Sequence, residues 1–349
     1  MTNGKQEGVP SFFAELPPIP EHLVNKVAPV KAEVRTYPDG LTEELKKEFI
    51  EAIKEADAKA VPFELTPYNL GAWSPSKVKS FQKCQWQFYL KYILKYKIPE
   101  QLQSASDPLS ANVGKAAHQI LEYTQMGKKI EDAYLKTKLE YVIKDKLLTE
   151  AQWTELVDSL HYNISSFGER IEALGRNTKI RRILTELRIA VTKDYEPTTF
   201  FDDSAWLRGV VDLILQLENG DIIIIDHKTG GGEGSPNVYK SQLDWYKVLF
   251  HYGIEEIEGA QTGVHFIRAG DVKMIDYSDK KAIEGNIRNT LEMTIEGALD
   301  TVKEKGYFKH VRGPYCKWCE YDNVGCKSGE LKSTELGTKK WFPIKSAPV

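Results

Sequence analysis

Hydrophobic side chains recur every three or four positions through much of the first half of the chain, a spacing typical of helices with one buried face. This pattern predicts helices over residues 42–60, 111–127 and, with breaks, 131–182. Another helix should begin at Ser74-Pro75, because serine is a favoured N-cap and proline is tolerated at the first helical position. We expect that helix to run to about Tyr96.

The pattern changes at Ile183, where short segments rich in β-branched residues replace the helical spacing. Three strands are predicted there, ILTELRIAVTK, WLRGVVDLILQL and DIIIID, and Asn219-Gly220 between the last two indicates a hairpin. A helix should follow, then two strands and a long helix, near 237–252, 262–269, 272–277 and 279–306. This order predicts an α/β (α+β mixed) fold, in which helices flank a central mixed β-sheet.

The same pattern divides the chain into four parts. An N-terminal tail and helix occupy 1–70, and a helical region with a basic helix, Cys84 and His118 occupies 71–182. The strand-rich core follows, and a cysteine cluster with a C-terminal tail ends the chain, at 183–310 and 311–349.

Composition is ordinary for a soluble globular protein, with 41% hydrophobic and 28% charged residues in 349. No run of 18 apolar residues exists, and the first ten residues lack the hydrophobic stretch of a secretory signal. We therefore expect a cytoplasmic protein that does not enter membranes. In that compartment the four cysteines favour metal binding or reactivity over disulfides.

The net charge of −3 does not indicate a nucleic-acid partner, but the positive charges are concentrated in two segments. Residues 74–99 hold six lysines and no acid, and residues 170–193 hold seven basic residues against two acids. Either segment is suited to follow a phosphate backbone. The alternative is that both are solvated helix faces.

Candidate chemistry lies at the end of the third predicted strand. Asp226 and Lys228 are two apart, so they share one face of that strand. Asp212 lies on the preceding strand, where an unpaired acid is costly. A two-residue turn would pair Asp212 with His227, whereas a three-residue loop over 218–220 pairs it with Asp226. We expect the three-residue loop, because it places Gly220 where a left-handed residue is needed.

Two converging carboxylates suit Mg²⁺ or Mn²⁺, which can polarise a phosphodiester and lower the pKa of a bound water. A neighbouring lysine can orient that water or offset charge that develops on the phosphate. The alternative is an edge-strand acid and lysine in an ordinary turn. A glycine-rich turn over Gly230–Gly232 leaves room beside Lys228.

Gly209-x-x-Asp212, Asp226-x-Lys228-Thr229-Gly230 and Gln242-x-x-x-Tyr246 resemble, in order and spacing, the signature of RecB-type nucleases of the PD-(D/E)XK superfamily. The resemblance covers about residues 74–330 and implies a restriction-endonuclease-like core with a helical N-terminal part. It implies catalytic roles for Asp212, Asp226, Lys228 and Glu186. It also implies Mg²⁺ or Mn²⁺ ligands, and residues that contact DNA or support the site. The ligands would be His118, Asp212, Asp226 and the backbone carbonyl of His227, and the supporting residues Gln242 and Tyr246.

The cysteines form a second candidate site. Cys316-x-x-Cys319, with Cys326 seven residues on, is a metal-chelating spacing, and Cys84 would complete a four-thiolate set. Four thiolates accept either zinc or an iron–sulfur cluster, and His310 can replace Cys84 in a zinc site. One cysteine before the nuclease motifs and three after them is similar to CRISPR-associated adaptation exonucleases and AddB-type nuclease domains. That similarity implies a [4Fe–4S] cluster, although the last gap is one residue longer than expected.

The resemblance implies a metal-dependent DNA nuclease, an exonuclease that acts on DNA ends or single strands in recombination, repair or degradation. Its partner is DNA, and a recombination or helicase protein is a candidate second partner because the sequence holds no Walker motif of its own. Two alternatives stay open. One is a catalytically inactive DNA-binding protein stapled by a metal, and the other is a zinc-binding interaction protein.

Overall fold

The structure is a computed structural model that describes residues 39–59, 66–95, 108–174, 178–229, 235–305, 307–322 and 326. Four features expected from the sequence lie outside these residues. They are the N-terminal tail up to residue 38, Lys97, the turn Gly230–Gly232 and the C-terminal tail beyond Cys326.

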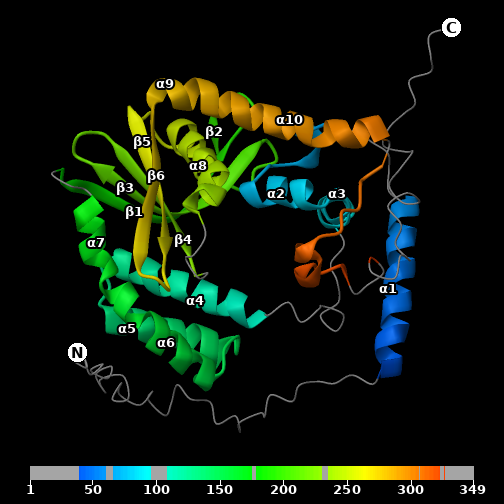
Figure 1. Cartoon of the computed structure of the whole chain (residues 1–349), viewed down its shortest axis with the longest axis horizontal. Coiled ribbons are helices and arrows are strands. Elements are labelled where there is room, and N and C mark those ends of the chain that lie inside the picture. The colour runs from blue at the N-terminus through cyan, green and yellow to red at the C-terminus, as the bar shows by residue number, and fades with distance from the viewer. Residues whose placement is uncertain are drawn as a thin grey trace, which may run out of the picture.

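Six strands form one mixed sheet in the order β2-β1-β3-β4-β5-β6 (Figure 1). Strands β4 and β5 are parallel, because a helix crosses over between them, and the other neighbours are antiparallel. The strands span Ile180–Val191 (β1), Pro197–Thr198 (β2), Leu207–Leu217 (β3), Ile222–Lys228 (β4), Gly259–Phe266 (β5) and Asp271–Asp279 (β6). The mixed sheet with flanking helices is confirmed, and β2 is a strand that the sequence pattern did not predict.

The β3–β4 hairpin has the predicted three-residue loop. Leu213 lies opposite Ile225, and the same register continued by one residue places Asp212 opposite Asp226. Gly220 closes the loop with φ +87°, a left-handed conformation that glycine adopts without steric cost. The turn chemistry therefore fixes which face of the sheet the two acids share.

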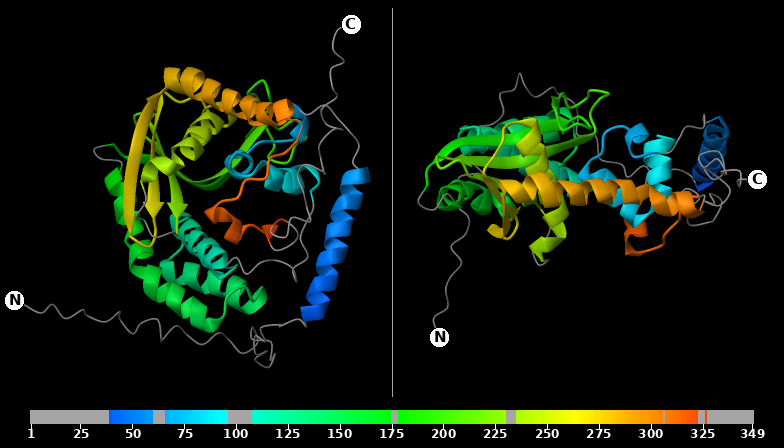
Figure 2. Two further views of the ribbon diagram at one scale, coloured as in Figure 1. Left: turned by 45° about the vertical axis from the view of Figure 1, so that its right-hand side comes forward. Right: turned by 90° about the horizontal axis from the view of Figure 1, so that it is seen from above.

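Helices cover both faces of the sheet and form two hydrophobic cores (Figures 1 and 2). One core packs Ile214, Ile222 and Ile224 against helices that include α2, α8 and α10. The other packs alternate residues of the same strands, such as Leu213 and Ile225, against α4, α6 and α7. The helices are α1 (Asp39–Lys59), η2 (Tyr68–Leu70), α2 (Pro75–Lys83), α3 (Gln85–Phe88), η3 (Tyr89–Ile93), α4 (Pro108–Gln125), α5 (Ile130–Lys138), η5 (Leu139–Lys144), α6 (Glu150–Ser165), α7 (Phe167–Leu174), η6 (Pro236–Tyr239), α8 (Lys240–Gly253), α9 (Lys280–Ala282), η7 (Ile283–Ile287), α10 (Arg288–Lys305) and η8 (Pro314–Trp318).

The predicted helix start at Ser74-Pro75 is confirmed, since the Ser74 side chain accepts a hydrogen bond from the backbone N–H of Lys77. The prediction of one helix up to Tyr96 is wrong. Helix α2 ends at Lys83, and Cys84 is extended, with φ −158° and ψ 106°. The break lets Cys84 leave the helical path and line a pocket with the other cysteines.

The predicted helical region up to residue 182 is also too long. Helix α7 ends at Leu174, and β1 already begins at Ile180, which pairs with Leu217 of β3. Cross-strand pairing with β3 therefore determines the start of β1, and a count of helical spacing does not detect it.

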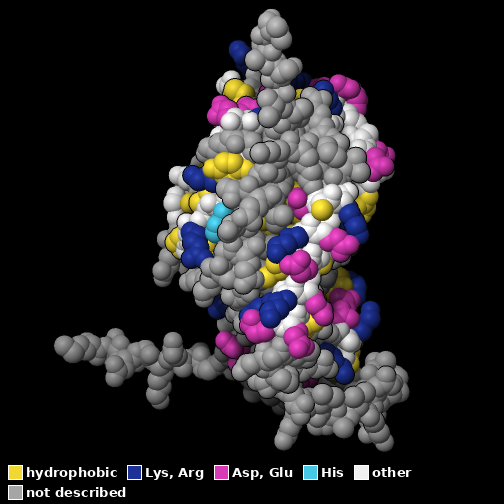
Figure 3. All heavy atoms as spheres, turned by 90° about the vertical axis from the view of Figure 1, so that its right-hand side faces the viewer, with side chains coloured by type: hydrophobic (Ala, Val, Ile, Leu, Met, Phe, Trp, Pro, Cys, Tyr) yellow, Lys and Arg dark blue, Asp and Glu magenta, His cyan; other side chains and the backbone are white. Residues whose placement is uncertain are grey.

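Charges of both signs are intermixed on the face that carries α1 (Figure 3). Lysines of α1 pair with glutamates one turn away, as in Lys46 with Glu43 and Lys54 with Glu51. This pairing gives the helix a solvated surface without a basic stripe. None of the helices within the described ranges is long and apolar enough to cross a membrane.

Candidate active site

Three carboxylates lie side by side across the adjacent strands β1, β3 and β4. Thr185 and Leu187 pair with Leu213 and Val211, so Glu186 between them lies opposite Asp212. Asp212 in turn lies opposite Asp226 by the hairpin register. Glu186 has φ +48°, a left-handed conformation that costs a non-glycine residue energy and is concentrated at functional sites.

His118 on α4 meets two of these acids. Its Nδ1 lies 3.8 Å from Glu186 Oε1 and 3.8 Å from Asp212 Oδ1. One ligand atom from each of the three residues falls within 4.8 Å of the others, a set that could hold a metal ion. Burial alone would lower the pKa of His118, but the two carboxylates outweigh it and raise that pKa. The site therefore attracts positive charge.

Asp226 is buried, with 1% of its side chain exposed, beside Lys228 and Gln242. Gln242 Nε2 donates to Asp226 Oδ1 at 2.9 Å, and Lys228 Nζ lies 2.5 Å from Oδ2. That close contact lacks hydrogen-bond geometry, and Oδ2 accepts no hydrogen bond within the described ranges. Burial raises the pKa of Asp226, and Lys228 opposes the shift. The Lys228 ammonium therefore already supplies positive charge at that oxygen.

The pKa of Asp212 is raised as well. Burial and the nearby charge of Asp226 raise the pKa of its carboxyl to about 7. The backbone N–H of His227 donates to Asp212 Oδ2 at 2.6 Å, which opposes the shift and fixes the carboxylate. Two acids this close in a dry setting resist joint ionisation unless positive charge is supplied.

Helix α8 approaches the sheet closely behind the acids. A Cβ added at Gly209 would lie 2.9 Å from Leu249 Cδ1 and 3.1 Å from Tyr246 Cε1, which explains why glycine is needed there. Gln242 Nε2 also contacts Tyr246 Oη at 2.7 Å, so both helix residues face Asp226. The sequence motif thus corresponds to a single packed unit of strand and helix.

The side chain of His227 belongs to the opposite face of β4. Its Nδ1 lies 3.0 Å from Nδ1 of His265, and its Nε2 lies 3.3 Å from Nε2 of Gln125. Burial and the neighbouring His265 lower the pKa of His227, so a neutral ring is expected there. The role of the His227 carbonyl as a metal ligand stays a prediction, since only its amide has a described contact with the acids.

The lysines of the first basic segment have different environments. Lys79 is near enough to Asp226 and Lys228 for their charges to affect its pKa, which burial lowers. Lys77 instead turns inward and donates to the Leu70 carbonyl at 2.7 Å, and Lys91 pairs with Glu320 at 2.8 Å. Of these three, only Lys79 therefore approaches the acids.

Two of the acids, Glu186 and Asp212, line a cleft of about 920 Å³ that also includes Lys115, Glu122 and Arg188. Sequence reasoning did not single out Lys115 or Glu122, and it counted Arg188 only within the second basic segment. Glu122 could have been found, because it lies one helical turn after His118 and faces the same way. Burial and the nearby Glu186 raise the pKa of Glu122. Arg188 lies two residues after Glu186 on β1 and offers a cation for a phosphate.

All four cysteines line one small pocket, together with His310. Hydrogen bonds join the segment around Cys84 to the segment that holds the other three cysteines. Tyr315 Oη donates to the Lys83 carbonyl at 2.7 Å, and Trp86 N donates to the Lys309 carbonyl at 3.2 Å. Burial raises the pKa of two of these thiols, to about 11 for Cys319 and about 12 for Cys326. A bound metal would therefore have to displace their protons.

Known proteins share sequence with this chain. The family model described as PD-(D/E)XK nuclease superfamily matches residues 72–326, a range that includes the acids, Lys228 and the four cysteines. An ATP-dependent helicase/nuclease subunit of Pediococcus pentosaceus is 23% identical over 159 residues, which are 42% of this chain and 13% of that protein. A crystal structure of SSO0001 covers 80% of this chain and 93% of its own at 14% identity, with a TM-score of 0.29, too low to bear on function. Because the family match extends over most of the chain and includes the whole acid and lysine constellation, the chain belongs to the PD-(D/E)XK nuclease superfamily.

Proposed function

We propose that the protein is a Mg²⁺- or Mn²⁺-dependent deoxyribonuclease that hydrolyses phosphodiesters at DNA ends or in single strands. The observation that carries this proposal is the row of Glu186, Asp212 and Asp226 across three neighbouring strands, with His118 and Lys228 at its two sides. Superfamily membership indicates a nuclease, and the geometry supports a metal-assisted one.

The chain's own residues fit such an ion. His118, Glu186 and Asp212 offer an imidazole nitrogen and two carboxylate oxygens, a donor set that Mn²⁺ and Mg²⁺ accept. Asp226 adds a neighbouring carboxylate, which lies opposite Asp212 and whose Oδ2 is 2.5 Å from Lys228 Nζ. When bound, the ion would lower the pKa of a water and polarise the scissile phosphate.

The remaining residues position the reaction. Lys228 lies beside Asp226, with its Nζ 5.3 Å from the centre of the Tyr239 ring, where it can orient a water or contact the phosphate. Gln242 holds Asp226 through one oxygen, and the His227 amide holds Asp212. Fixed partners of this kind keep both carboxylates aimed at one point.

The test is cleavage of end-labelled single- and double-stranded DNA with Mg²⁺ or Mn²⁺. The wild type should cut, and Asp226→Ala and Lys228→Ala should each abolish cutting while DNA binding is largely kept. Lys281→Ala, which removes an exposed lysine in α9, is the matched control and should cut normally. Cleavage by both active-site variants at the wild-type rate would refute this site. A wild type that never cuts would refute the nuclease and leave the alternative of a catalytically inactive DNA-binding protein.

End dependence needs a separate substrate. A covalently closed single-stranded circle offers no ends, so an exonuclease should leave it intact and degrade the same strand once linear. Cleavage of the circle would show an endonuclease. The relative from Pediococcus is named as part of a helicase/nuclease, which supports a helicase as the partner that would supply single strands. Co-purification with a DNA helicase would test that partner.

We also propose that the four cysteines hold a [4Fe–4S] cluster, with zinc as the alternative. Cys84 comes before the acids in the chain and the other three come after them, yet all four line one pocket. The cluster would be structural, because nothing of the acid row lines this pocket. A brown protein with broad absorption and stoichiometric iron and sulfide is expected.

Zinc content in a colourless protein would overturn the cluster assignment. His310 lies in the same pocket and separates the two outcomes further. His310→Ala should leave a four-cysteine cluster intact. In a site built from three cysteines and a histidine, the same change should release zinc, whereas Cys84→Ala should not.

A further inference from the structure

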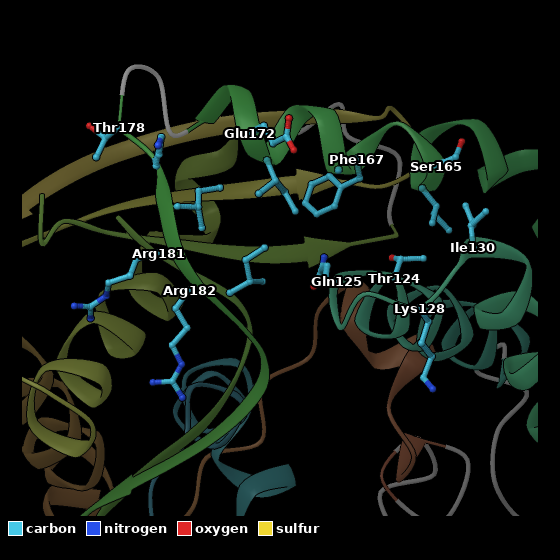
Figure 4. A pocket seen from close by; sticks show the side chains of 16 residues that line it. Thr124, Gln125, Lys128, Ile130, Ser165, Phe167, Glu172, Thr178, Arg181 and Arg182 are labelled. Carbon is cyan, nitrogen blue, oxygen red and sulfur yellow. The ribbon is translucent and has the colours of Figure 1, made fainter. Parts of the chain in front are cut away.

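A second cavity, of about 890 Å³, lies on the other face of α4, where α4, α7 and the start of β1 meet (Figure 4). The cavity shares no lining residue with the cleft of the acids. Its walls combine two kinds of chemistry. Ile164, Phe167, Ile171 and Ile180 give it an apolar wall, and cationic side chains from two elements surround that wall.

The charge of the cavity is strongly positive. Lys128, Lys179, Arg181 and Arg182 line it, against the single carboxylate of Glu172. Three of these cations, Lys179, Arg181 and Arg182, come from the second basic segment of the sequence, and none of the three lines the cleft of the acids.

Three of the cations have no ion pair. Arg181 is 3.8 Å from Glu255, whereas Arg182, Lys128 and Lys179 are exposed and have no carboxylate within 4.0 Å in the described ranges. Figure 4 shows Arg182 and Lys128 on opposite sides of the cavity, with Gln125 between them.

Gln125 adds a polar group inside the cavity. Its Oε1 is buried and accepts no hydrogen bond within the described part of the chain, while its Nε2 lies 3.3 Å from Nε2 of His227. The oxygen and nitrogen of an amide are assigned from such contacts. An acceptor without a donor is costly to bury, so a ligand that brings an N–H group would be favoured here.

We propose that this cavity holds an unpaired nucleotide of the DNA strand, with its base against the apolar wall and its phosphates between Arg182 and Lys128. The inference rests on the proposed nuclease function. An apolar surface beside cations is the arrangement that binds single-stranded nucleic acid without regard to sequence. A base inside a cavity cannot be paired, so the site selects single strands or frayed ends.

The cavity is placed for the strand that is cut. Helix α4 and strand β1 border both this cavity and the cleft of the acids. Arg182 and Glu186 are four residues apart on β1, about 13 Å along a strand at about 3.3 Å per residue. A strand bound at Arg182 can therefore reach Glu186 within a few nucleotides.

Two variants test the cavity by different routes. Arg182→Ala combined with Lys128→Ala removes the phosphate contacts. Gly168→Phe should fill the space, because Gly168 lines the cavity from α7 and an added Cβ there would meet no atom within 4 Å. Loss of a helical glycine favours folding, so this variant should stay folded. Lys281→Ala is the control for loss of one exposed cation.

Affinity for a labelled single strand is measured by fluorescence anisotropy without divalent ions, over a range of salt concentrations. Gly168→Phe should weaken binding roughly tenfold with an unchanged salt slope. The double variant should make the slope of log K against log salt shallower by about 1.4, since each lost phosphate contact removes about 0.7. Lys281→Ala should change neither quantity. Wild-type affinity and slope in both cavity variants would overturn the proposal.

Two further readouts separate the sources of the nucleotide and the fate of the proposed function. If free deoxyadenosine monophosphate binds the wild type but not Gly168→Phe, while single-strand affinity is unchanged, the cavity takes a free nucleotide and the DNA assignment is wrong. A wild type that binds single strands but cuts no DNA would refute the nuclease function. In that case the salt slopes would still show whether the cavity binds the DNA strand.

Discussion

Replacement of Asp212 by asparagine should stabilise the metal-free protein while it removes nuclease activity. Asparagine is close in shape to aspartate and keeps an oxygen for the His227 N–H, which donates to Asp212 Oδ2 at 2.6 Å. What it removes is a negative charge that burial and Asp226 make costly. The variant therefore tests whether the site stores electrostatic strain that only a cation relieves.

The size of the effect follows from the pKa of Asp212, which is raised from 3.8 to about 7. A folded-state pKa above the unfolded value means that the folded protein holds the proton more tightly. The contribution of Asp212 to stability is then fully present below about pH 4 and is lost as the pH rises to 7. About 3 pKa units correspond to roughly 4 kcal/mol at pH 8, an upper figure because Asp226 and Glu186 share the strain.

The assay is urea unfolding followed by circular dichroism, at pH 4.5 and pH 8, after free divalent ions have been removed. Asp212→Asn should raise the free energy of unfolding by up to about 4 kcal/mol at pH 8 and by only about 1 kcal/mol at pH 4.5, where Asp212 of the folded protein is still protonated. Asp145→Asn is the matched control, because Asp145 is exposed. That control should change neither value.

Added Mn²⁺ completes the test. At a hundred times its dissociation constant, the ion should stabilise the wild type by about 2.7 kcal/mol and the variant much less. If Asp212→Asn is no more stable than the wild type at pH 8, or gains as much at pH 4.5, the carboxylates are not strained and the electrostatic reasoning fails.

Three further outcomes are expected. Mn²⁺ affinity, measured by calorimetry, should rise with pH up to about 7 and then level, because the protonated Asp212 carboxyl, with its pKa of about 7, cannot bind the ion. An affinity that stays the same from pH 5 to pH 8 would contradict this. Gly209→Ala should lower the free energy of unfolding by about 1–3 kcal/mol in urea, because its Cβ would lie 2.9 Å from a leucine methyl of α8; full stability would mean that α8 moves freely. Cys84→Ala should lose bound metal and activity together, at a cost on the order of 5 kcal/mol for releasing so long a loop; a folded, active variant that keeps its metal would refute the staple.

Much of the fold could be predicted from the sequence because its signals are local. Ser74 and Pro75 mark a helix start, and Gly220 marks the last position of the hairpin loop. Both depend on backbone conformation within a few residues, so no knowledge of the tertiary structure was needed. The helix break at Cys84 was missed because no glycine or proline marks it, and the cysteines that share its pocket lie more than two hundred residues away in the sequence.

The site shows the same division. Asp212 and Asp226 could be brought together from turn length alone, since one hairpin joins them. Lys79 could not, because it reaches the site from a helix whose packing no local pattern fixes. A histidine on α4 was expected near the acids only through family resemblance. Its actual position, 3.8 Å from Glu186 and from Asp212, is a tertiary fact.

Glu186 connects these two levels. Its φ of +48° interrupts a strand whose neighbours keep their pairing with β3, so the unusual backbone is confined to one residue. A non-glycine residue held in this conformation costs about 1–3 kcal/mol, and glycine or asparagine would adopt it more easily. The pairing of β1 with β3 holds Glu186 in this backbone conformation. A glutamate is needed there because glycine or asparagine would lack the carboxylate. The strained backbone of Glu186 and the costly negative charge of Asp212 therefore lie together beside His118. A cation bound there would offset the charge of Asp212, and the Glu186 carboxylate would be in place to bind it.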